Sequence, residues 1–142
     1  MAKQLIFSYV EKRGRLYPLI PITLRAQQEL TLYALVDSGA VVSVFPEDVA
    51  KAIGLDLEKG EELYLTGVGG YIKGKLIPNV EAVIEGFRIQ IPIVFVPYTP
   101  IELAVLGRKG FFEKFEITFR EWEKKLIARP ESMRIISNVQ PC

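Results

Sequence analysis

The chain has 142 residues, a net charge of +1, a hydrophobic fraction of 49% and a charged fraction of 25%. This length suits one domain with one modest core, and the composition is that of an ordinary globular protein. The near-neutral charge gives no reason to expect nucleic acid or an anionic membrane as a partner. No apolar run approaches the roughly 20 residues of a membrane span, and the first residues lack the layout of a signal peptide.

The residue types that are absent from the sequence exclude several kinds of catalytic site. The sequence contains no His, which excludes a Ser-His-Asp triad, a Cys-His pair and a His-ligated metal. The lone cysteine, Cys142, cannot form an internal disulfide, and this predicts a cytoplasmic protein. Acid-base chemistry would have to come from carboxylates, Lys, Tyr or this Cys.

Strand patterns dominate the chain. Runs of aromatic and β-branched residues alternate with polar or glycine-containing breaks, which is typical of strands joined by turns. Gly67, Gly69 and Gly70 predict a hairpin with a glycine-rich tip, and Gly86 predicts a second turn. Prolines inside the patterns predict edges or bulges. The predicted strands span residues 3–10, 15–24, 29–36, 61–66, 71–77, 80–85, 87–96, 115–120 and 124–128.

Two short helices are predicted among these strands. The first spans residues 46–53, because a proline and two acids open it and Gly54 follows as a stop. The second begins near Gly107 and carries Phe111, Phe112 and Phe115 on one face. We expect one domain over residues 1–142, in which 129–142 form either a terminal strand or a loose tail. The fold class is therefore all-β.

Asp37 is the candidate for chemistry because it stands between two apolar runs, in the segment 33–42. A carboxylate in such a place is costly unless it is hydrogen-bonded or protonated. Ser38 offers a hydroxyl, and Gly39 lets backbone amides approach without a Cβ in the way. The triplet therefore suits an acid with a perturbed pKa, but Asp, Ser and Gly are also the common residues of turns. On the triplet alone, the turn is favoured.

Three segments, in order along the chain, give the triplet a context. Residues 35–40 (LVDSGA) are similar to the active-site loop of the retropepsin family, the retroviral-type aspartic proteases and their cellular relatives. Residues 67–73 (GVGGYIK) are similar to the flap of its viral members, and 105–108 (VLGR) resemble its hydrophobic-hydrophobic-Gly-Arg element. The segment 43–46, followed by a helix up to Gly54, also resembles cellular members. Three ordered matches are far more specific than any one.

The resemblance implies a fold and a mechanism. The fold would be a small closed β-barrel-like acid protease lobe with one or two short helices, one lobe per subunit. Two copies of the chain would pair, and each would contribute Asp37 as a catalytic carboxylate that shares a proton with its twin. Ser38 and Gly39 would support this loop, and Ser38 would hydrogen-bond across the dimer. The residues expected to bind the substrate are Ala40, Gly67, Val68, Gly69, Gly70 and Leu106.

The resemblance implies a peptide or protein substrate, with no metal and no cofactor. We expect residues 3–10, together with Ile135 and Ile136, to contribute to the dimer. Val41 and Val42 stand where viral members carry acids that pair with the Gly-Arg arginine, which leaves the ion-pair role of Arg108 open. Two alternatives to a protease remain: a non-catalytic domain of the same fold that binds peptides or dimerises, and an unrelated ligand-binding β-barrel. The intact Asp37-Ser38-Gly39 triplet favours the protease.

Overall fold

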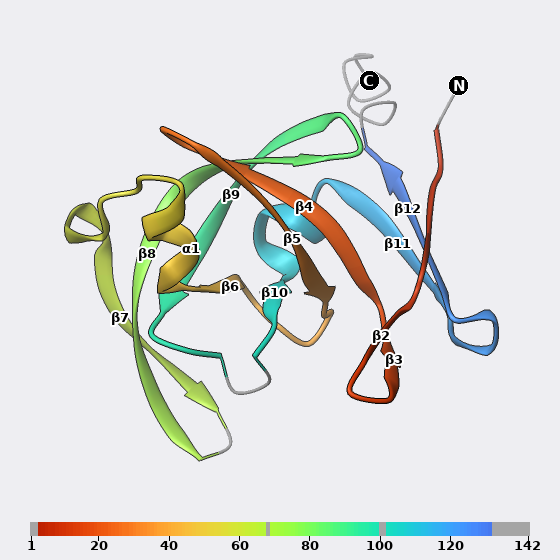
Figure 1. Cartoon of the computed structure of the whole chain (residues 1–142), viewed down its shortest axis with the longest axis horizontal. Coiled ribbons are helices and arrows are strands. Elements are labelled where there is room, and N and C mark those ends of the chain that lie inside the picture. Colours follow the sequence, from red (N-terminus) through yellow and green to blue (C-terminus); the bar gives the residue numbers. More distant parts are fainter. Residues whose placement is uncertain (1–2, 68, 100–101, 132–142) are drawn as a thin grey trace, which may run out of the picture.

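The computed structural model describes residues 3–67, 69–99 and 102–131, and these are mostly strand, as predicted (Figure 1). Within this described part, no helix has the length and apolar character needed to cross a membrane. The helical segments are α1 (Glu47–Ala52), η1 (Leu57–Lys59), the single turn η2 (Arg108–Phe112) and η3 (Glu121–Glu123). The strands are β1 (Leu5–Ser8), β2 (Val10–Lys12), β3 (Arg15–Tyr17), β4 (Leu19–Arg25), β5 (Glu29–Val36), β6 (Ser43–Pro46), β7 (Glu61–Gly67), β8 (Gly70–Ile84), β9 (Phe87–Val96), β10 (Ala104–Leu106), β11 (Phe115–Arg120) and β12 (Lys125–Pro130).

The main sheet closes on itself. Its strand order is β4-β5-β10-β6-β9-β8-β7, and β4 also pairs with β8 from Thr23↔Val83 to Arg25↔Glu81. The 15-residue β8 makes this possible, because its first part pairs with β7 and its last part with β4. The predicted closed architecture is confirmed as a ring-like sheet that is not a strict barrel.

A second sheet brings the two ends of the described chain together. Its order is β1-β12-β11, with Leu5 opposite Ala128 in an antiparallel pair (Figure 1). The inward residues of this sheet, among them Leu5, Phe115 and Leu126, belong to the same buried cluster as the ring. Both sheets therefore rest on one core, and a separate hairpin of β2 and β3 joins them along the chain.

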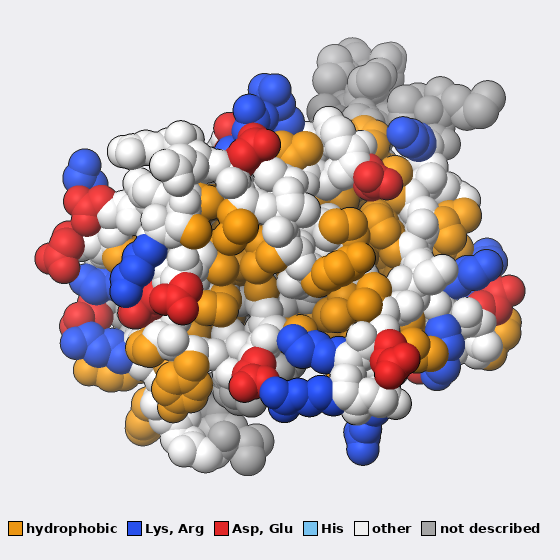
Figure 2. All heavy atoms as spheres, in the orientation of Figure 1, with side chains coloured by type: hydrophobic (Ala, Val, Ile, Leu, Met, Phe, Trp, Pro, Cys, Tyr) orange, Lys and Arg blue, Asp and Glu red, His pale blue; other side chains and the backbone are white. Residues whose placement is uncertain are grey.

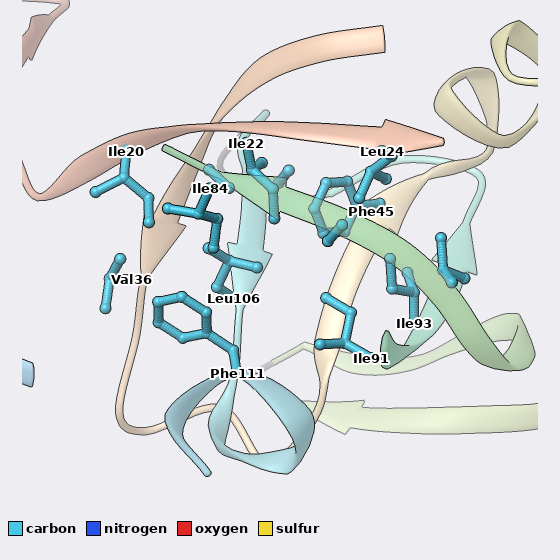
Figure 3. Close-up of a cluster of buried hydrophobic side chains, with 14 of the residues drawn as sticks. Ile20, Ile22, Leu24, Val36, Phe45, Ile84, Ile91, Ile93, Leu106 and Phe111 are labelled. Carbon is cyan, nitrogen blue, oxygen red and sulfur yellow. The ribbon is translucent and has the colours of Figure 1, made fainter. Parts of the chain in front are cut away.

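The core is built from alternate residues of the ring strands. Ile20, Ile22 and Leu24 of β4 are fully buried, as the period of two in a strand requires (Figure 3). Phe111, on the turn η2, points toward Leu106 and Val36 in the same view. Burying one such side chain stabilises the fold by about 1.5–3 kcal/mol. The turn η2 is thus anchored in the core, directly after β10.

Several predicted boundaries are confirmed and others shift. Residues 29–36 and 87–96 are strands with these bounds, α1 lies inside 46–53, and Gly86 makes the predicted turn. Residues 71–77 and 80–85 form one strand rather than two, with a register shift between Ile77 and Val80 opposite Pro92. The missing amide of a proline makes such an irregularity the expected solution. Residues 3–10 and 15–24 are each broken into two strands, at Tyr9 and Pro18.

The predicted second helix is wrong beyond its first turn. Phe115 lies in β11 rather than on a helix with Phe111 and Phe112. The helix does not continue because Gly110 has a φ of +85°, and a Cβ there would meet Pro92 and Ile91 at 2.8 and 3.0 Å. The short strands β6 and β10 were not predicted. Strand β12 extends to Pro130, and the predicted terminal segment from 132 onward, with Ile135 and Ile136, lies outside the described residues.

Candidate active site

Asp37 lies where three neighbouring strands meet. It follows β5 directly and opens the connection from β5 to β6, residues 37–42. Strand β10 lies between those two strands, parallel to β5 (Val105↔Leu35) and antiparallel to β6 (Val105↔Val44). The connection that carries Asp37 must therefore pass the end of β10. We call residues 37–42 the aspartate loop.

Backbone hydrogen bonds fix the first half of the aspartate loop. The Asp37 N–H donates to the Leu106 carbonyl at 3.0 Å, and the Ala40 N–H donates to the Asp37 carbonyl at 3.1 Å. The Gly39 N–H donates to Oδ1 of the Asp37 carboxylate at 2.9 Å. The carboxylate is half-buried, whereas Ser38 and Gly39 are exposed. The result is an oriented carboxylate that remains open to solvent or to a partner.

The second half of the loop is held by the segment after β10. The Arg108 N–H donates to the Ala40 carbonyl and the Lys109 N–H to the Val41 carbonyl, both at 2.8 Å. Gly107 lies so close that a Cβ there would stand 2.5 Å from the Val42 carbonyl oxygen. A glycine is required at this position for space, since its φ of −106° is open to any residue.

A buried serine completes this contact. Ser43 is fully buried, and its Oγ accepts a hydrogen bond from the Gly107 N–H at 3.0 Å. Sequence reasoning did not single out Ser43 as a site residue, because one serine six positions after Asp37 carries no recognisable chemistry. The only signal was its place in the segment 43–46. Ser43 and Gly107 act on Asp37 by positioning its loop.

The glycine-rich hairpin is built quite differently. Strands β7 and β8 pair from Glu61↔Leu76 to Gly67↔Gly70, and Val68 lies outside the described residues. Gly69 and Gly70 have φ values of +99° and +120°, and a Cβ on either would meet nothing within 4 Å. These positive values favour glycine by backbone conformation. A side chain at either glycine would therefore find open space around it.

One face of this hairpin carries two exposed tyrosines. The rings of Tyr64 and Tyr71 pack edge to face with centroids 6.5 Å apart. Beside them, Lys73 Nζ lies 2.9 Å from a carboxylate oxygen of Glu62. This hydrogen bond lowers the pKa of Glu62 and raises that of Lys73. These contacts stiffen the arms of the hairpin and leave its tip free.

The predicted site residues thus fall into two groups. Asp37, Ser38, Gly39 and Ala40 share one turn, whereas Gly67, Gly69 and Gly70 lie on the hairpin tip. The side chain of Leu106 is fully buried and faces the core, and its carbonyl is what touches Asp37 (Figure 3). Its predicted contact with substrate, like that of Ala40 and the glycines, stays a prediction. Among the described residues, no three metal-ligating side chains gather into a metal site.

Comparison with known families identifies this arrangement. A family model described as aspartyl protease matches residues 21–109. That span begins in β4 and contains the aspartate loop, the glycine-rich hairpin and the Gly107-Arg108 pair. The chain belongs to the retropepsin-like aspartyl proteases. A search of curated proteins gave no match.

The matched span leaves out both ends of the described chain. Strands β1, β2 and β3 precede it, and the hairpin of β11 and β12 follows it. The hairpin of β7 and β8 corresponds in position to the predicted flap, and we use that name for it below.

Proposed function

We propose that this aspartyl protease family member is an aspartic endopeptidase that hydrolyses peptide bonds as a homodimer, with one Asp37 from each subunit activating a water. The observation that carries the proposal is the Asp37 carboxylate, which is oriented by the Gly39 N–H and remains half-exposed at the end of β5. One carboxylate acts as general base toward water while the other, protonated, acts as general acid toward the peptide carbonyl.

The need for two carboxylates supports the dimer. One chain carries a single Asp-Ser-Gly triplet, so the second carboxylate comes from a second copy across a two-fold axis. Like charges at close range share a proton, and the rate is then bell-shaped in pH with an acidic optimum. Ser38, exposed beside Asp37, is available to hydrogen-bond to its counterpart.

The N-terminal strand suits the predicted interface. Strand β1 is an edge of the second sheet, since the order β1-β12-β11 covers only one of its two sides. Ile6, on this strand, is 61% exposed. The face shown in Figure 2 carries hydrophobic side chains toward its middle and charged ones toward its margin. Apolar surface of this kind favours contact with another polypeptide.

The shape of the flap supports a peptide as the substrate. A hairpin with an open glycine tip can close over a peptide held as an extended strand, whose backbone supplies the hydrogen bonds. We expect Gly67, Val68, Gly69 and Gly70 to contact that peptide. The cytoplasmic location predicted from the lone cysteine belongs to the same proposal.

The deciding experiment compares wild type with Asp37→Asn on a peptide library at acidic pH. We expect kcat/KM to fall about 10²–10⁴-fold, the usual worth of general acid-base catalysis, while folding and dimerisation persist. Asp48→Asn is the matched control, because Asp48 is an exposed aspartate on α1. Equal turnover by the Asp37 variant, or an active monomer in sedimentation, would remove the dimer mechanism. Peptide binding without cleavage by either protein would instead support the non-catalytic alternative.

A further inference from the structure

A hollow lies directly beside the aspartate loop. Its volume is about 440 Å³, and it is lined by Ser38, Val41, Arg108, Lys109, Phe112 and Glu113. Ser38 follows the proposed catalytic residue in the chain, so this hollow adjoins the site of chemistry. Neither the family match nor the proposed mechanism gives it a role.

The charges in the hollow are unbalanced. Among the described residues, no carboxylate lies within ion-pair distance of Arg108 or Lys109, whereas seven other cations of the chain have such partners. Oε1 of Glu113, the one acid in the lining, accepts the Gly110 N–H at 2.9 Å. Val41, which is 65% exposed, also lines the hollow. The lining therefore holds two cations and one acid, and that acid is bonded to a main-chain amide and not to either cation.

The backbone holds these cations in place. The Arg108 and Lys109 amides are bonded to the carbonyls of Ala40 and Val41, both at 2.8 Å. Phe111, two residues further on, is fully buried in the core. The two basic side chains therefore start from fixed points beside the aspartate loop, which is the arrangement that a selective contact requires.

We propose that this hollow is a subsite for an acidic side chain of the substrate peptide, with Arg108 and Lys109 as the residues that determine this preference. The inference rests on the proposed function. Consecutive Cα atoms are about 3.8 Å apart, and an extended peptide advances about 3.3 Å per residue. Because neighbouring residues of an extended peptide lie this close together, a side chain that enters beside Ser38 would belong to a residue near the cleaved bond.

The test uses the full-length protein and sets of peptides that differ only by Glu, Gln or Lys at one position near the bond. We expect wild type to prefer Glu over Gln by about three- to tenfold in kcat/KM, as a pair of exposed ion pairs would give. Added salt should shrink this preference. Arg108→Glu with Lys109→Glu should invert it toward Lys, and Arg108→Gln with Lys109→Gln should level it.

The variants keep their main-chain hydrogen bonds, and the control is Lys125→Glu, an exposed lysine on β12 away from the hollow. Efficient cleavage without any preference for Glu would overturn the subsite and leave the protease intact. A weaker dimer with unchanged peptide preference would overturn it too, and would assign the cations to the subunit interface. If wild type cleaves none of the peptides, the proposal that the protein is a protease is wrong. The same peptides are then compared by binding, where a preference that inverts with the double Glu variant supports the subsite and its absence overturns it.

Discussion

Two glycine positions with opposite surroundings distinguish the aspartate loop from the flap. A Cβ at Gly107 would stand 2.5 Å from the Val42 carbonyl oxygen and 2.9 Å from that of Ala40. A Cβ at Gly69 would meet nothing within 4 Å, and its φ of +99° is what favours glycine there. One glycine allows two backbone segments to touch, and the other allows a free tip to turn.

The Asp37 carboxylate is therefore carried by a firmly held loop, whereas the flap, which we propose closes over it, has a tip with few contacts. Three backbone hydrogen bonds tie the aspartate loop to residues 106–109, and the buried Ser43, directly after the loop, accepts a fourth from the Gly107 N–H. Among the described residues of the flap tip, Gly67 pairs with Gly70, and a Cβ on Gly69 or Gly70 would meet no atom within 4 Å. Local opening takes little free energy where few buried contacts are lost. Substitutions that disturb one region should therefore leave the other nearly unchanged.

The largest expected effect comes from Gly107→Ala. The added methyl collides with backbone atoms that cannot rotate away, so we expect the free energy of unfolding to fall by about 3 kcal/mol. The aspartate loop must also shift, and peptide turnover should drop in whatever protein remains folded. Chemical denaturation measures the first effect and kcat the second. A Gly107→Ala variant as stable as wild type would mean that the contact with Val42 is not held in solution.

A smaller effect is expected from Ser43→Ala, which breaks the same contact from the other side. The Gly107 N–H would be left buried without its acceptor, at a cost of about 1–3 kcal/mol. Ser43→Thr retains the hydroxyl and is the control for its loss. If Ser43 positions Asp37, the alanine variant should lose kcat rather than KM, and threonine should restore part of it. Equal kcat for all three proteins would reduce Ser43 to a purely structural role.

The sequence predicts the long elements of both regions and misses the short ones. Residues 29–36 and 87–96 carry strand patterns long enough to show their period, and both bounds agree with the structure. Strands β6 and β10 have four and three residues. Strand β10 is held extended by pairing with β5 and β6, and β6 by pairing with β10 and β9, which no local pattern reveals. The same limit applies to η2, where three phenylalanines gave a helical pattern that Gly110 interrupts.

The sequence predicted those parts of the candidate site that lie in recognisable motifs. Asp37, Gly39 and the 105–108 element were found through ordered resemblance, and the structure brings them together. Ser43 was missed because its role is one hydrogen bond across 64 positions of sequence. The contact of Leu106 with substrate stays a prediction, and what the structure adds is its side chain in the core and its carbonyl bonded to the Asp37 N–H. The motif alone does not reveal this tertiary contact.

A kinetic effect without a comparable loss of stability is expected from Gly69→Ala in the flap. The methyl meets no atom, and the positive φ disfavours it by about 1 kcal/mol within the tip alone. The tip should therefore change its shape, and we expect KM for peptides to rise several-fold. The melting temperature should fall much less than in Gly107→Ala. Unchanged kinetics would show that the hairpin tip does not contact the substrate.

The smallest effect concerns a third region, the hairpin of β11 and β12, which lies outside the matched family span. Tyr9 is 8% exposed and anchors this hairpin, because its hydroxyl donates to Oε1 of Glu121 at 3.0 Å and its N–H donates to the Lys124 carbonyl. Burial, together with the Glu121 carboxylate, raises the pKa of Tyr9 to about 12. The folded protein therefore keeps the phenol neutral at a pH where the unfolded chain has begun to ionise it.

The contribution of Tyr9 to the free energy of unfolding should therefore decrease at high pH. With a raised pKa in the folded state, the contribution of Tyr9 is complete below pH about 10 and is lost as the pH rises toward about 12. Tyr9→Phe should be about 1 kcal/mol less stable than wild type at pH 8, through loss of the hydrogen bond. The gap should narrow between pH 10 and 12, because the phenylalanine cannot ionise in either state.

Tyr33→Phe, an exposed tyrosine, is the control and should track wild type throughout. A stability gap that stays constant to pH 12 would show that the Tyr9 hydroxyl titrates alike in both states. Peptide turnover at acidic pH should be nearly the same in all three proteins, since the aspartate loop and the flap are held by contacts that Tyr9 does not make.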